Sequence, residues 1–154
     1  MQKTFFFAFA IFLFIGCRPN AVKHDTSRYI AETSRFGEYY KNTFNKLLPQ
    51  KETTFIIVSS DGCGGCIEGL IKNIISHPKK DGYLFIISQK AVLRFNADDL
   101  KNNSSVLIDQ QNAVDRLPFH KGNIAVISVS DKAIYNIKPI EPNEVSSVLE
   151  KINE

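Results

Sequence analysis

Two cysteines, Cys63 and Cys66, are separated by two glycines in a spacing that suits thiol chemistry. At the start of a helix, unpaired backbone N–H groups and the helix dipole favour a thiolate. A second cysteine three residues later lies about one turn along that helix, where its sulfur can reach the first. In such a pair Cys63 would attack a substrate disulfide, and Cys66 would resolve the mixed disulfide.

The residues on either side of the two cysteines predict the elements that position them. Residues 54–59 are a continuous β-branched and aromatic run, which indicates a strand covered on both faces. A turn at residues 60–62 follows. From Cys66 to His77 the apolar residues recur with a helical period, and Pro78 lies just past the end. We therefore expect Cys63 at a junction between a buried strand and a helix.

The rest of the chain continues this alternation of helices and strands. An aromatic stripe predicts a first helix over residues 28–48, packed through Phe36, Tyr40, Phe44 and Leu47 and stopped by Pro49. Helices between strands indicate an α/β fold, with a mixed, mostly parallel central sheet flanked by helices. The later expected elements are strands at 83–88, 105–109, 124–129 and 133–137, a helix start at 96–99, a helical turn at 111–117, a hairpin turn at 131–132 and a closing helix at 142–152.

This order of elements around a Cys-x-x-Cys resembles the thioredoxin fold. The extra short strand at residues 106–109 is similar to the membrane-tethered, extracytoplasmic thiol–disulfide oxidoreductases of that fold, over about residues 28–154. The resemblance implies that Cys63 and Cys66 are the catalytic residues and that no cofactor or metal is needed. It also implies a protein disulfide or dithiol as client, and an upstream redox partner.

The chain departs from that family at three positions. Gly62 stands where an aromatic residue usually precedes the first cysteine, and Ile57 stands where many thioredoxins bury a carboxylate. The family's cis-proline falls at Gly122 or Asn123, and neither is proline. The loop at residues 119–123 is therefore expected to leave a degenerate groove; the alternative is a substitute site in which His120 and Asn123 contact the client or the dithiol.

Two further residues are candidates for an accessory role in the exchange. Glu68 could relay a proton, although a solvated acid in the first turn of a helix is the simpler interpretation. His120 lies in the loop that replaces the cis-proline region. No basic residue adjoins the motif in sequence, and Asp61 precedes it, so we expect a less activated thiol than in a strong oxidant.

Other interpretations of the two cysteines stay open. They could form a structural disulfide in a non-catalytic module of the same fold that binds a partner. They could also bind a metal, but two thiolates need two more ligands. The three histidines are scattered, and His120 is the one suited to serve.

The N-terminus predicts export. Lys3 precedes a twelve-residue apolar run, which Gly16 and Cys17 follow. This segment resembles a bacterial lipoprotein signal, which implies cleavage before Cys17 and lipid attachment to it; the alternative is an ordinary signal peptide. Residues 1–16 would then be the signal, 17–27 a tether and 28–154 the domain. The expected location is extracytoplasmic, on a membrane that faces a bacterial periplasm.

The composition narrows the class of protein. The chain has 154 residues, 44% of them hydrophobic and 23% charged, which is typical of one globular domain. Its net charge of +3 comes without a basic cluster, which disfavours a nucleic-acid partner. Three cysteines are too few for a disulfide-dense scaffold.

The anchor can be tested by replacing Cys17. Cys17→Ser should abolish lipidation and either release the protein into the soluble fraction or leave it uncleaved, because no sulfur would remain to carry the acyl chains. Fractionation and intact mass measure this result. Correctly processed protein that still partitions with membranes would contradict the lipoprotein interpretation.

Overall fold

Five strands form one sheet in the order β3-β2-β1-β4-β5. The structure is a computed structural model, and it describes residues 24–61, 63–76, 81–95, 98–119 and 124–153. The strands are β1 (Thr53–Val58), β2 (Tyr83–Ser88), β3 (Val106–Asp109), β4 (Ile124–Ser130) and β5 (Ala133–Ile140). The α-helices are α1 (Ile30–Phe44), α2 (Gly64–Ser76), α3 (Gln89–Arg94) and α4 (Val145–Asn153).

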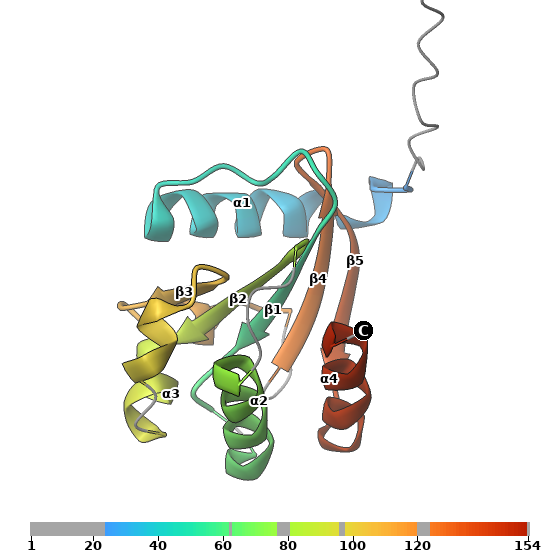
Figure 1. Ribbon diagram of the computed structural model, residues 1–154. Helices are drawn as coiled ribbons and strands as arrows, with labels where there is room; N and C mark the ends of the chain where they lie inside the picture. Colours follow the sequence, from blue (N-terminus) through green and yellow to red (C-terminus); the bar gives the residue numbers. More distant parts are fainter. Residues whose placement is uncertain (1–23, 62, 77–80, 96–97, 120–123, 154) are drawn as a thin grey trace, which may run out of the picture.

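The central strand β1 is buried on both faces, as its continuous hydrophobic run predicts. Phe55 and Ile57 pack on one side of the sheet with the aromatic residues of α1. Ile56 and Val58 pack on the other side with the apolar residues of α2 and α4. Figure 1 shows α1 on one face of the sheet and α2 and α4 on the other. The expected α/β architecture with flanking helices is therefore confirmed.

The prediction that the sheet is mostly parallel is wrong. β1 pairs with β2, and β2 with β3, in parallel, but β4 is antiparallel to both β1 and β5. A parallel connection usually needs a crossover helix. In its described part, the chain between β3 and β4 has only a 3₁₀ turn at Ala113–Arg116, so it returns antiparallel to β1.

The first helix ends earlier than predicted. It stops at Phe44 because Asn45 adopts a left-handed conformation with φ of 53°, and the Asn45 N–H bonds to the Lys41 carbonyl. Leu47, expected in the core, is therefore 68% exposed, while Leu48 is buried. Pro49 lies beyond the end of the helix and does not stop it.

The segment after β2 also differs from the prediction. The helix α3 begins at Gln89, directly after β2, and buries Ala91 and Val92. The predicted helix start at residues 96–99 lies partly outside the described residues, and a 3₁₀ helix occupies Asp98–Asn102. The helix α3 is short and buries only two side chains, so its hydrophobic periodicity is too weak to predict it from the sequence.

The C-terminal elements follow the prediction closely. Asp131 and Lys132 both have positive φ, the backbone form of the tight turn that joins β4 to β5. Their N–H groups also bond to the carbonyls of Gln50 and Pro49, which fixes the hairpin to the loop after α1. The closing helix α4 follows a 3₁₀ turn that begins at Pro142.

A buried carboxylate ends β3. Asp109 has no exposed surface. It accepts hydrogen bonds from the Tyr39 hydroxyl at 3.1 Å and from the backbone N–H groups of Val114 at 2.6 Å and Gln111 at 3.0 Å. Burial, and secondarily the Asp109 charge, raise the pKa of Tyr39 far above its usual value, so this hydroxyl remains a donor. Asp109 thereby ties β3 to α1 and to the 3₁₀ turn that follows.

Removing either partner should destabilise the fold. Asp109→Ala removes the acceptor of three hydrogen bonds, one of them from a buried hydroxyl, so the free energy of unfolding should fall by about 3 kcal/mol. Tyr39→Phe should cost about 1–2 kcal/mol. Denaturant unfolding measures both values. Tyr40→Phe is the matched control, because the buried Tyr40 on the same helix makes no such hydrogen bond; an equal loss there would refute the role of Asp109.

Candidate functional site

The structure brings the two predicted catalytic residues together at the start of α2. The chain leaves β1 at Val58, and the Cys63 carbonyl accepts hydrogen bonds from the N–H groups of Cys66 and Ile67, both at 3.1 Å. Cys63 therefore occupies the position just before the first helical residue. The Cys66 thiol donates to Cys63 Sγ at 2.7 Å. No disulfide joins the two cysteines in this structure, and their sulfurs are in direct contact.

The two thiols have different surroundings. Cys63 is exposed, whereas Cys66 is half-buried and packs against the core beneath α2. The hydrogen bond from the Cys66 thiol, helped by the N–H groups of Cys66 and Gly65, lowers the pKa of Cys63. The same hydrogen bond, with burial, raises the pKa of Cys66. Cys63 is thus the sulfur that ionises first and that a large substrate can reach.

Hydrogen bonds fix the loop that leads into the motif. Both the N–H and the hydroxyl of Ser60 donate to the Asp115 carboxylate, at 2.9 and 2.7 Å. Ser88, the last residue of β2, donates to Asn112 Oδ1 at 2.8 Å and lies 3.3 Å from Asp115 Oδ2. The segments that follow β1, β2 and β3 are therefore joined at one edge of the sheet, beside the cysteines.

The structure adds a cation that sequence reasoning missed. Arg94, the last residue of α3, donates from Nη1 to the Ser60 carbonyl at 3.4 Å. A side-chain Cβ built on Gly64 would lie 3.0 Å from Arg94 Nη2. The guanidinium therefore lies against the first turn of α2, beside Gly64. No basic residue adjoins the motif in the sequence, but in the folded structure Arg94 lies next to it.

The signal that could have revealed this residue is the parallel pairing of β1 and β2. The carboxyl ends of parallel neighbours lie at the same edge of a sheet, so the segments that follow them meet there. Cys63 follows β1 and Arg94 lies in the helix that follows β2. Because the sequence does not predict α3, it could not indicate which residue of that segment lies beside the cysteines.

The accessory candidates receive no direct support. The Glu68 carboxylate pairs with Lys72 Nζ at 2.6 Å one turn along α2, and the side chain of Glu68 is partly exposed. His120, Gly122 and Asn123 lie outside the described residues, whereas Phe119 is buried in the core on the α1 side. Across the ranges that the structure describes, no peptide bond is cis.

The described residues contain no cluster of three or more side chains that could hold a metal ion. His24 stacks on Tyr135, with the ring centroids 3.7 Å apart, so the chain already contacts the domain inside the segment expected to be a tether. Cys17 and the signal segment lie outside the described residues.

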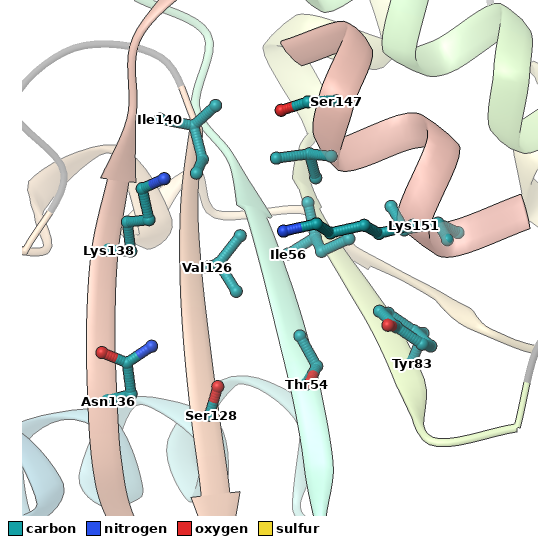
Figure 2. Close-up of a pocket in the computed structure, with 12 residues that line it drawn as sticks. Thr54, Ile56, Tyr83, Val126, Ser128, Asn136, Lys138, Ile140, Ser147 and Lys151 are labelled. Carbon is teal, nitrogen blue, oxygen red and sulfur yellow. The ribbon is translucent and has the colours of Figure 1, made fainter. Parts of the chain in front are cut away.

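A separate hollow of about 220 Å³ opens between the sheet and α4. Figure 2 shows its lining, with Lys151 extending from α4 across the sheet toward Val126. Thr54 and Tyr83, at the beginnings of β1 and β2, line one side. The cysteines follow the opposite end of β1, so this hollow is not part of their site.

No family model, curated protein or solved structure matches this chain. In the part of the chain that the structure describes, no helix is both long and apolar enough to cross a membrane.

The contact between the sulfurs predicts a specific pH dependence of alkylation. Because its pKa is lowered, Cys63 should form a thiolate, and react with iodoacetamide, at lower pH than an ordinary thiol of pKa about 8.5. Cys66→Ala removes the largest cause of that shift and should move the Cys63 profile to higher pH. Mass spectrometry of the modified peptide follows each site.

Cys66→Ser is the matched control for this experiment. Its hydroxyl can still donate to Cys63 Sγ, so its profile should lie between those of the wild type and of Cys66→Ala. Faster modification of Cys66 than of Cys63 in the wild type would reverse the assignment of roles.

Proposed function

We propose that the protein is a lipid-anchored thiol–disulfide oxidoreductase of thioredoxin-like fold that acts outside the cytoplasm. The observation that carries the proposal is the exposed Cys63 at the start of α2, which accepts a hydrogen bond from the half-buried Cys66 thiol at 2.7 Å. An accessible low-pKa sulfur beside a resolving sulfur is the arrangement that disulfide exchange requires.

The order and direction of the elements support the fold assignment. A parallel β1-α2-β2 unit carries the dithiol after its first strand. The antiparallel hairpin of β4 and β5 and the closing helix α4 follow, and α4 packs on the same face as α2. This is the arrangement expected for the thioredoxin fold around its dithiol.

The exchange is balanced as follows for the reduced protein. The Cys63 thiolate attacks a substrate disulfide, forms a mixed disulfide and expels one substrate thiolate. Cys66 loses its proton to that thiolate or to solvent and attacks Cys63 Sγ. The Cys63–Cys66 disulfide forms, and the second substrate thiolate leaves. Two electrons pass from the protein to the client, and an upstream redox partner reverses the change.

The location follows from the anchor and the chemistry together. Lipid on Cys17 would hold the domain at a membrane surface through several acyl chains, each contributing about 0.8 kcal/mol per buried CH₂. The periplasm is an oxidising compartment in which disulfides form and persist. Clients and the redox partner would then be proteins of that compartment, and no nucleic acid is involved.

The reduction potential of the Cys63–Cys66 pair tests the proposal. We expect full-length protein in glutathione redox buffers to give a value near or above about −200 mV, as suits exchange. A potential below about −300 mV, with no turnover of a small disulfide, would instead indicate a structural disulfide in a partner-binding module.

Trapping of the client gives a second readout. Cys66→Ser should accumulate mixed disulfides on Cys63, because the resolving thiol is missing. The double variant Cys63→Ser/Cys66→Ser is the control and should accumulate none. Equal capture by both variants would show that the complexes do not form through Cys63.

A further inference from the structure

The guanidinium of Arg94 lies against the dithiol turn in a position to select among substrates. We propose that Arg94 binds a carboxylate carried by the substrate, so that the preferred disulfides have a carboxylate close to the scissile sulfurs. This inference rests on the proposed exchange at Cys63 and names the class of disulfide that it favours.

The position of Arg94 follows from how the chain is folded at this edge. Arg94 Nη1 reaches the Ser60 carbonyl at 3.4 Å, in the loop before the cysteines. Nη2 lies 3.0 Å from where a side chain on Gly64 would begin. Gly64 follows Cys63 directly in the chain, so a ligand group on the guanidinium would lie beside the disulfide under attack.

The charge of Arg94 is available for a ligand. Within the described residues, no carboxylate forms an ion pair with Arg94, and its one hydrogen-bond acceptor there is the Ser60 carbonyl. The Asp115 carboxylate, which also binds Ser60, accepts its hydrogen bonds from Ser60 and Ser88. A guanidinium has five N–H donors, so most of those of Arg94 face solvent or a ligand.

The neighbouring aromatic ring helps to hold the cation in place. The Arg94 guanidinium lies 5.2 Å from the centroid of the half-buried Phe95 ring. Stacking of this kind restricts the plane of the guanidinium, and a planar fork of donors matches a carboxylate with two parallel hydrogen bonds. A carboxylate is therefore the chemistry that fits the site.

A different role for Arg94 would be to raise the reactivity of Cys63 itself. These two roles differ in one measurable way. A general effect on the Cys63 thiolate changes its reaction with every electrophile equally. Recognition of an anion changes only the reaction with anionic reagents, because the neutral ones make no ion pair.

The experiment therefore compares iodoacetate with iodoacetamide. Alkylation of Cys63 is followed in full-length Cys66→Ala protein in neutral detergent, at a pH where Cys63 is fully ionised. Adding Arg94→Gln should lower the ratio of the iodoacetate rate to the iodoacetamide rate by about threefold or more, as loss of an exposed ion pair allows. Arg94→Lys should retain part of the ratio. Lys90→Gln on the same helix makes the same change in net charge and should leave the ratio unaltered.

Reduction of disulfide substrates then tests whether the preference for a carboxylate also applies to disulfide exchange. Protein with both cysteines should reduce 3,3′-dithiodipropionate faster, relative to neutral 2-hydroxyethyl disulfide, than its Arg94→Gln variant does. Cystine peptides with Asp or Asn beside the cysteine distinguish a protein client from a small molecule as the source of the carboxylate.

An unchanged rate ratio in Arg94→Gln would overturn the inference. If both alkylation rates also fell by the same factor, Arg94 would be a positioning residue for the thiolate. Exchange without preference for the carboxylate would refute the inference and leave the proposed function standing. Selective alkylation without exchange of any disulfide would refute the proposed function, and of the inference only the anion-binding role of Arg94 would stand.

Discussion

The parallel pairing of β1 with β2 is the constraint on which the site depends. Val58 lies opposite Ile87, so the two strands end nearly level. The segments that leave them must therefore share one edge of the sheet. The first segment carries the two cysteines at the start of α2, and the second carries Arg94 at the end of α3. A shift of one residue in this register would also turn every buried side chain of β1 to the opposite face.

Two carboxylates maintain that edge, and both act through hydrogen bonds to neutral groups. Asp109 joins β3 to Tyr39 of α1, and Asp115 joins the loop after β1 to the end of β2. Hydrogen bonds to a carboxylate are stronger than those between neutral groups, so a few of them can order short loops. Asp115 is engaged in this way, and none of the described carboxylates pairs with Arg94. In the described part of the chain the guanidinium therefore lies beside the cysteine turn with no acidic partner.

The sequence predicts the buried strands and the dithiol junction well, because each depends on local pattern. Residues 54–59 and 83–88 are continuous apolar runs, and their strands lie within one residue of the prediction. Three features depend on contacts that local pattern does not contain. The end of α1 is set by the left-handed Asn45. The direction of β4 goes with the short connection after β3, whose described part holds no α-helix. The place of Arg94 is set by the register of two strands.

The two glycines between the cysteines have different surroundings. Each costs a helix about 1 kcal/mol relative to alanine. At Gly65 an added Cβ would meet nothing within 4 Å, so no contact in the described structure demands glycine there. At Gly64 an added Cβ would press on the Arg94 guanidinium at 3.0 Å, and the flexible arginine would have to move by a few tenths of an ångström. Glycine at 64 therefore allows the cation to lie directly on the turn that carries the reactive sulfur.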